Sequence, residues 1–175
     1  YTTHVHPQYD FYYPLGWSLE NNNSTAFCWD KLGNNANFPD NAHSDSIAMH
    51  IVGFSYTESL DDWMFTPPFL LEEGKTYEFG FWYKTTNFTG ENNIEKMEVK
   101  IGTSNNSAAM METPVFYDDQ IEVVEWTEFS SIVTVSETGE YYFGFHGFSD
   151  PLQWILHVDD ISLQEVETTN YMVTF

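Results

Sequence analysis

Adjacent carboxylates are the residues of this chain with the widest chemical repertoire. Four acidic pairs occur, and they are Asp61/Asp62, Glu72/Glu73, Asp118/Asp119 and Asp159/Asp160. A glycosidase needs two carboxylates that face each other across a sugar at roughly 5–9.5 Å. Since neighbouring residues of a strand point to opposite faces, an adjacent pair does not supply that geometry by itself. The pairs therefore give little support to glycoside hydrolysis.

The Asp159-Asp160 pair is the most informative of the four, because it interrupts an otherwise apolar strand. Trp154-Ile155-Leu156 precedes the pair, and Ile161 and Leu163 follow it. Two carboxylates in such a setting are unfavourable unless water, a cation or hydrogen-bond donors reach them. Calcium takes carboxylate and carbonyl oxygens. The pair therefore predicts an oxygen-ligand cation site, and the alternative is that both carboxylates lie at a strand end in water.

Nucleophiles and soft-metal ligands are poorly represented in the sequence. It contains no Gly-x-Ser-x-Gly motif and no phosphate-binding glycine loop. Cys28 lies between Phe27 and Trp29, an apolar setting that predicts a buried and unreactive thiol. His4 and His6 share one face of an extended segment, but the other histidines lack the spacing of zinc ligands. These patterns predict that the protein is not an enzyme.

Charge and composition exclude further classes of protein. The 175 residues include 5 Lys+Arg, all of them lysine, and 27 Asp+Glu, for a formal net charge of −22. A nucleic-acid binder needs basic residues to replace phosphate counterions, and the anionic cytoplasmic membrane face would repel this chain. No run of about 18 apolar residues exists that would insert into a membrane. Aromatic residues make up 18% of the chain, which predicts a folded core rather than disorder.

Strand patterns dominate the chain. Alternation with period 2 marks residues 46–52, 76–84, 94–101, 127–135, 140–147 and 154–163. In the third of these segments, Glu95 is expected on the polar side with Glu98. Asn- and Gly-rich stretches such as 21–24 and 32–35 predict turns, and residues 107–112 predict one short helical turn. Many short strands favour an antiparallel sandwich or barrel.

The domain organisation is expected to be simple. Residues 1–166 are expected to form a single domain, a size that supports a hydrophobic core. Residues 167–175 are expected to be a tail or the start of a following segment, so the chain is expected to belong to a larger protein.

The order of several motifs resembles that of one known family. The matching segments are residues 9–17, 42–46, 61–71, 77–83, 95–103, 141–146 and 158–163. They include Pro14-Leu15-Gly16-Trp17 near the start and Val158-Asp159-Asp160-Ile161-Ser162-Leu163 at the end. On these residues the chain resembles the cleaved-adhesin family, also described as choice-of-anchor J domains, and more distantly the MAM domains. Such domains occur largely in secreted multidomain proteins, and the bacterial ones are often from Bacteroidetes.

The resemblance implies an all-β fold, namely an antiparallel jelly-roll β-sandwich with little helix. It also implies a structural calcium ion near the junction of the first and last strands. By motif, the cation positions fall on Asp10, His43, Asp45, Asp159 and Asp160. Which of the last two carboxylates ligates the ion stays open.

The same resemblance implies a non-catalytic binding or adhesion module of a secreted or cell-surface protein. Jelly rolls bind sugars through aromatic side chains on an exposed face or at loop tips, and polar neighbours bind the hydroxyls. The expected ligand-binding residues are Tyr12, Tyr13, Asn87, Phe88, Phe148 and Asp150. The expected partner is a glycan or a host surface or matrix protein. The alternative is a structural spacer or protein-interaction domain of a larger surface protein, and a glycoside hydrolase is a third hypothesis.

Overall fold

The computed structural model describes the backbone of residues 3–5 and 12 and all atoms of residues 13–34, 36, 39–53, 55–86 and 93–166. In this part of the chain the strands are antiparallel and form two large sheets and one small one. The small sheet pairs β1 (Thr3–Val5) with β2 (Tyr12–Pro14). The helical content is the 3₁₀ turn η1 (Ser107–Ala109), within the segment for which a short helical turn is predicted. Within the described residues, no helix has the length and hydrophobicity needed to cross a bilayer.

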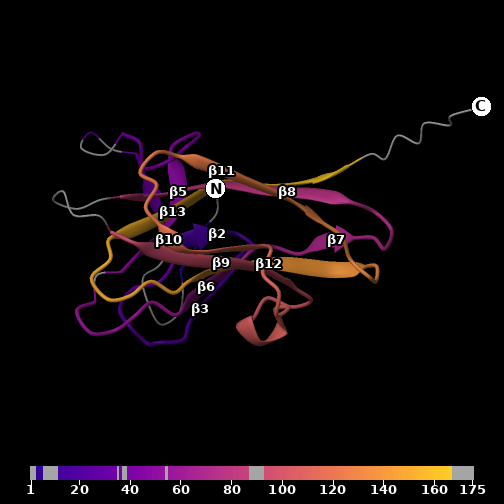
Figure 1. Cartoon of the computed structure of the whole chain (residues 1–175), viewed down its shortest axis with the longest axis horizontal. Coiled ribbons are helices and arrows are strands. Elements are labelled where there is room, and N and C mark those ends of the chain that lie inside the picture. Colours follow the sequence, from indigo (N-terminus) through magenta and orange to yellow (C-terminus); the bar gives the residue numbers. More distant parts are fainter. Residues whose placement is uncertain are drawn as a thin grey trace, which may run out of the picture.

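The two large sheets are named here after a central strand of each. The β12 sheet has the order β10 (Phe116–Ile121), β9 (Glu95–Gly102), β12 (Gly139–Gly147), β6 (Asp62–Phe65) and β3 (Ser18–Asn21), and β7 (Phe69–Leu71) also pairs with β12. The β8 sheet has the order β11 (Thr127–Val133), β8 (Tyr77–Thr86), β13 (Ile155–Glu165), β5 (Ile47–Val52) and β4 (Asp30–Gly33). Figure 1 shows the two sheets stacked as layers. The expected antiparallel β-sandwich is confirmed.

The core lies between the two layers, where alternate residues of each strand meet. Phe79 of β8 and Phe143 of β12 are fully buried, and their rings stack with centroids 3.9 Å apart and planes at 2°. Phe81 and Phe145 continue the contact, with centroids 5.3 Å apart in an edge-to-face arrangement. Aromatic side chains therefore join the two sheets, as the high aromatic content predicts.

One strand lies where the sequence predicts a turn. Leu32 and Gly33 belong to β4 and pair with Ala48 and Ile47 of β5. The Asn41 side chain donates a hydrogen bond to the carbonyl of Gly33 at 3.1 Å. The turn prediction for these two residues is wrong, because long-range pairing at a sheet edge overrides their weak local preference for strand.

Glu95 is also placed differently from its sequence pattern. The inward positions of β9 are Glu95, Met97, Val99 and Ile101, so the alternation begins one residue later than expected. Glu95 is fully buried, and the Ser149 hydroxyl donates to its Oε2 at 2.6 Å. Its Oε1 has no hydrogen-bond partner. Burial raises the pKa of Glu95 to about 7 despite the hydrogen bond from Ser149.

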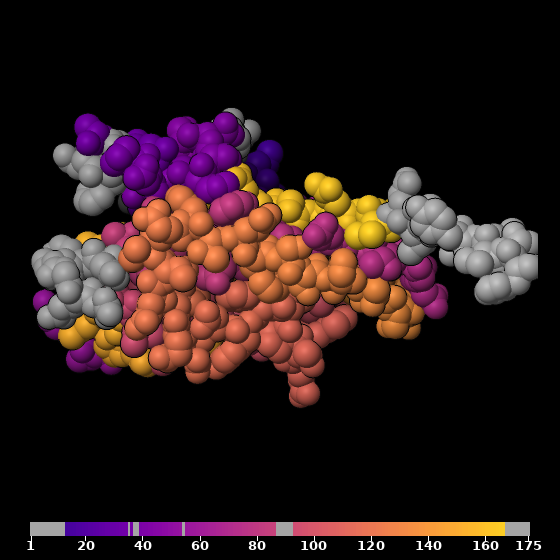
Figure 2. All heavy atoms as spheres, turned by 45° about the horizontal axis from the view of Figure 1, so that its top comes forward, coloured from indigo at the N-terminus to yellow at the C-terminus, as the bar shows by residue number. Residues whose placement is uncertain are grey.

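The segment between β9 and β10, which contains η1, projects from the body of the molecule (Figures 1 and 2). It is tied back to β3, because the backbone N–H of Ser107 donates to Glu20 Oε2 at 3.1 Å and Asn105 donates to the Ser18 hydroxyl at 3.0 Å. Met110 lies over Gly144 of β12, where an added Cβ would come within 3.0 Å of its sulfur. This segment therefore covers one end of the outer face of the β12 sheet.

Candidate functional site

The predicted cation residues Asp159 and Asp160 lie at an irregularity in β13. The pairing of β13 with β8 shifts register between Asp159 and Ser162, and Asp160 has a positive φ of 48°. Such a bulge inserts an extra residue and turns side chains away from strict alternation. Both carboxylates consequently contact the same loop, the one that carries His43 and Ser44.

Hydrogen bonds from that loop surround the two carboxylates. The backbone N–H groups of His43 and Ser44 donate to Asp159 Oδ2 at 2.8 and 3.3 Å, and that of Asp160 donates to Asp159 Oδ1 at 2.8 Å. His43 Nδ1 lies 2.6 Å from Asp160 Oδ2, and the Ser44 hydroxyl bonds Asp160 Oδ1. The His43 ring stacks on Trp82 with centroids 3.9 Å apart. Burial raises the pKa of Asp159, although its hydrogen bonds oppose that shift.

These residues meet only part of what calcium requires. Calcium takes six to eight oxygens, whereas Asp159, Asp160 and Ser44 offer two carboxylates and one hydroxyl that already have hydrogen-bond partners. Among the residues that the structure describes, no group of three or more His, Cys, Asp or Glu side chains is arranged to hold a metal ion. Asp45 is exposed, and Asp10 lies outside the described residues. The calcium site stays a prediction that needs further ligands.

The predicted ligand-binding residues are distributed over several parts of the fold. Asn87 and Phe88 lie outside the described residues, and of Tyr12 only the backbone is described. Tyr13 is 9% exposed and belongs to the core cluster, so its ring packs inside the protein. Phe148 and Asp150 follow β12 directly. They lie at the outer face of the β12 sheet, beside Tyr117 and Lys96.

A line of rings, which we call the aromatic row, crosses the outer face of the β12 sheet. Its members are Tyr117 of β10, Phe148 and His146 at the end of β12, and Trp63 of β6. Tyr117 and Phe148 stack with centroids 5.7 Å apart, and Phe148 lies 5.5 Å from His146. His146 stacks on Trp63 at 4.3 Å with planes at 5°. Tyr117 is 56% exposed whereas Trp63 is 5% exposed, so the open end of the row is at Tyr117.

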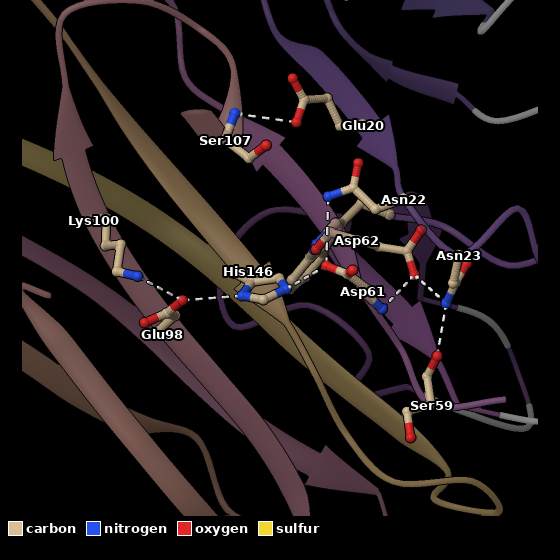
Figure 3. Close-up of polar contacts among 11 residues, drawn as sticks. Glu20, Asn22, Asn23, Ser59, Asp61, Asp62, Glu98, Lys100, Ser107 and His146 are labelled. Carbon is tan, nitrogen blue, oxygen red and sulfur yellow. Dashed lines mark hydrogen bonds and ion pairs between the residues drawn. The ribbon is translucent and has the colours of Figure 1, made fainter. Parts of the chain in front are cut away.

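Polar side chains run beside the aromatic row and are linked through His146 (Figure 3). Its Nδ1 lies 3.0 Å from Glu98 Oε1, and its Nε2 lies 2.9 Å from Asp61 Oδ1. Lys100 Nζ donates to the same oxygen of Glu98 at 2.9 Å, and Asn22 donates to the same oxygen of Asp61 at 3.4 Å. We call this five-residue chain the His146 bridge. It joins β9, β12, the residue before β6 and the loop after β3.

A second branch leads from this surface into the core. Asn23 Nδ2 donates to the carbonyl of Ser59 at 2.7 Å and to Asp62 Oδ2 at 3.4 Å (Figure 3). Asp62 is fully buried, and its Oδ1 has no hydrogen-bond partner. Burial raises the pKa of Asp62 to about 7. The thiol of Cys28 lies beside it and is buried, as expected.

Several residues of this surface do not stand out in the sequence. Tyr117 belongs to no matched motif, and Glu98 and His146 lie in the matched segments 95–103 and 141–146 without an expected binding role. The three residues meet because the register pairs Tyr117 with Glu98 and Glu98 with His146. The one signal in the sequence that indicates this surface is the alternation on β9, which places Lys96, Glu98 and Lys100 on the outward side.

Solved structures show what this chain is similar to. The K1 cleaved adhesin domain of Lys-gingipain from Porphyromonas gingivalis W83 matches with a TM-score of 0.67 at 15% identity, over 89% of this chain and 94% of that one. TmCBM61, solved in complex with beta-1,4-galactotriose, matches with a TM-score of 0.60 at 18% identity, over 87% and 90%. The CBM22-1 xylan-binding domain of Paenibacillus barcinonensis Xyn10C matches with a TM-score of 0.52 at 10% identity, over 88% of each chain. The fold expected from the cleaved-adhesin resemblance is confirmed.

No protein-family model and no curated protein matches the sequence.

Proposed function

We propose that the protein is a non-catalytic carbohydrate-binding or adhesion module whose glycan lies along the aromatic row. The observation that carries this proposal is the Tyr117–Phe148 ring pair, with a centroid separation of 5.7 Å, on a face lined by polar side chains. Tyr117 is 56% exposed and Phe148 is half-buried. An aromatic ring stacks on the apolar face of a sugar, and nearby carboxylates and amines bind its hydroxyls. Asp150 and Lys96, paired at 2.6 Å, stand beside the rings in that role.

Charge narrows the class of glycan. Three carboxylates, those of Asp61, Glu98 and Asp150, line the row, and two lysines pair with two of them. The whole chain carries a formal charge of −22. A polyanionic glycan would be repelled at ordinary ionic strength, so the proposed ligand is a neutral polysaccharide. The galactotriose named with TmCBM61 and the xylan named with CBM22-1 support this class.

The proposal also includes the setting of the module. Similarity to an adhesin domain and to carbohydrate-binding modules supports a secreted or cell-surface protein in which this module acts beside other domains. A host surface or matrix protein is the alternative ligand of the same face.

Replacing Tyr117 with Ala, or Phe148 with Ala, is expected to weaken glycan binding about tenfold, because each change removes one stacking ring. The wild type is first screened on a glycan array that includes galactans and xylans. Dissociation constants for the best ligand are then measured by isothermal titration calorimetry.

Tyr56→Ala is the matched control, since Tyr56 is 79% exposed but lies outside the aromatic row. It should bind like the wild type. If no glycan on a broad panel binds, carbohydrate binding is refuted and the spacer or protein-interaction hypothesis takes its place. Release of reducing ends from the bound polysaccharide would refute the non-catalytic part of the proposal.

We also propose that a calcium ion binds at Asp159 and Asp160 and stabilises the contact between β13 and the loop that carries His43 and Ser44. A ligand that binds only the native state raises stability by mass action. Added calcium should therefore raise the melting temperature by about 5–10 °C over the thoroughly chelated protein. Asp159→Asn should abolish the response, whereas Asp119→Asn, at an exposed position, should keep it. Equal melting temperatures in EDTA and in calcium would show that the proposed site is wrong.

A further inference from the structure

We propose that Ser149 is a positioning residue of the glycan-binding face, and that its buried hydroxyl sets the place of Phe148 and Asp150. The inference rests on the proposed function and deepens it, because it names the contact that orders two binding side chains before the glycan arrives. Phe148 is half-buried and Asp150 is exposed, whereas Ser149 between them is fully buried. The binding residues and their anchor therefore alternate along one short segment.

The pairing of β12 with β9 ends just before this segment, and its last pair is Gly147 with Met97. One further backbone hydrogen bond follows, in which the N–H of Phe148 donates to the carbonyl of Lys96 at 3.1 Å. The N–H of Lys96 donates instead to the Ser149 hydroxyl oxygen, at 2.8 Å. A side chain thus takes the place of a backbone carbonyl at the end of the sheet, and the N–H of Lys96 keeps a partner.

Hydrogen bonds fix both the side chain and the backbone of Ser149. Its hydroxyl accepts from the N–H of Lys96 and donates to Glu95 Oε2 at 2.6 Å. Its carbonyl accepts from the N–H of Leu60 at 2.9 Å. Glu95 and Ser149 are both fully buried, so no water takes over when the hydroxyl is lost. An unsatisfied buried group is unfavourable, and the hydroxyl is therefore held in the orientation that serves both neighbours.

The inward anchor determines where the two outward side chains lie. Because Ser149 points into the protein, an extended segment directs Phe148 and Asp150 to the outer face. There Phe148 stacks on Tyr117 with centroids 5.7 Å apart, and Asp150 binds Lys96 Nζ at 2.6 Å. The side chain of Asp150 is 61% exposed, and an exposed ion pair does little to hold a chain in place. The buried hydrogen bonds of Ser149 are therefore the contacts that order this part of the face.

The other end of the loop between β12 and β13 has its own attachment. The N–H of Ile94 donates to Gln153 Oε1 at 2.7 Å, and the N–H of Gly53 donates to the carbonyl of Trp154 at 3.0 Å. Neither contact involves Ser149. Loss of the Ser149 hydroxyl is therefore expected to displace residues 148–150 while the rest of the loop stays attached to the protein.

The test measures affinity by calorimetry for the neutral oligosaccharide that the array screen selects, on variants whose near-ultraviolet circular dichroism shows them folded. Ser149→Ala should raise the dissociation constant about tenfold, like Phe148→Ala. In the Phe148→Ala background the same change should add less than threefold, because the ring that it positions is gone. Ser130→Ala is the matched control, since its hydroxyl donates to Glu78 at 2.6 Å on the opposite sheet. It should bind like the wild type.

Ser149→Cys gives a second value even where the alanine variant does not fold. It keeps the size of the side chain and replaces the hydroxyl with a weak donor, so the dissociation constant should rise at least threefold. A residue that only stabilises the fold would leave the affinity of the folded protein unchanged. Wild-type affinity in folded Ser149→Ala or Ser149→Cys would therefore overturn the positioning proposal while glycan binding stands.

A second readout does not depend on a glycan. The nuclear Overhauser effect between the rings of Tyr117 and Phe148 reports their stacking directly, with Phe148→Ala providing the assignment. It should be present in the wild type and in Ser130→Ala, and it should be lost or strongly weakened in Ser149→Ala. An unchanged effect in folded Ser149→Ala would overturn the positioning proposal. Absence of glycan binding by the wild type would instead overturn the proposed function, and the ring contact would still test whether Ser149 places Phe148.

Discussion

Replacing Phe143 with Ala is expected to lower the free energy of unfolding by about 3–5 kcal/mol. Phe143 is fully buried and stacks on Phe79 of the opposite sheet with centroids 3.9 Å apart, and it meets Phe69 edge-to-face at 5.9 Å. Its removal leaves a cavity at the centre of the contact between the sheets. Because a domain of this kind is stable by about 5–15 kcal/mol, the loss is a large fraction of the total. Urea unfolding followed by tryptophan fluorescence measures it.

Two further variants make the expected loss in Phe143→Ala interpretable. Phe143→Leu keeps most of the apolar volume and should cost about 1–2 kcal/mol, so it gives a value even where the alanine variant does not fold. Ile132→Ala, at a position that is 58% exposed, should stay within about 0.5 kcal/mol of the wild type. A Phe143→Ala loss no larger than that of Ile132→Ala would contradict the central position of the ring stack.

Replacing Glu95 with Gln is expected to remove much of the stability loss that the wild type shows as pH rises from 4.5 to about 7. The pKa of Glu95 rises from 4.5 to about 7 on burial, so the folded state binds the proton more tightly than the unfolded state. Its contribution to stability is complete below pH 4.5 and is lost as pH rises through 7. At about 1.4 kcal/mol per pKa unit, the loss at pH 8.5 is about 3 kcal/mol. An amide carries no charge at any pH and escapes this loss.

Urea midpoints at several pH values between 5.5 and 8.5 test the expectation for Glu95→Gln. The variant should gain on the wild type from pH 5.5 to about 7 and then keep a constant advantage, because Glu95 is ionised in both the folded and the unfolded wild type above its raised pKa. Asp62 remains in both proteins, and its pKa, raised by burial to about 7, leaves a second and parallel decline. Glu112→Gln, at an exposed position, should follow the wild-type profile. Parallel curves for Glu95→Gln and the wild type would show that Glu95 is not a buried acid.

Acid should destabilise the protein through a different group. His157 is fully buried, and burial lowers its pKa to about 3, with His50 and Lys84 adding to the shift. The unfolded state therefore takes up the proton first, and the contribution of His157 is lost as pH falls from 6.5 towards 3. Glu95 and Asp62 lose their contributions as pH rises to about 7, and His157 loses its contribution as pH falls, so stability should be greatest on the acid side of neutrality.

The sequence predicts the sandwich well because period-2 alternation reports the burial of each strand directly. The strands around Phe79 and Phe143 lie where the pattern places them. The resemblance groups His43 with Asp159 and Asp160 as cation ligands, and the structure places the three side by side. Their role as cation ligands stays a prediction. The pattern fails at Leu32 and Gly33, where a long-range strand pairing determines the local structure.

Whether an aromatic side chain lies in the core or at the surface is harder to predict from the sequence. Tyr13 lies in the short strand β2 and Phe148 directly follows β12, and both look alike as candidates in the sequence. Yet Tyr13 is in the core and Phe148 stacks at the outer face with Tyr117. Whether a ring is buried depends on what the rest of the chain lays over it. That information is spread over segments far apart in the sequence.

The sequence by itself determined that this protein is an acidic, aromatic-rich, all-β sandwich, since composition and alternation are local properties. The tertiary structure alone decided which polar groups meet. His146 lies 48 residues from Glu98 and 85 residues from Asp61, and strand register brings all three within hydrogen-bonding distance. Register is set by the summed packing of both sheets, so no short segment of the chain specifies this contact.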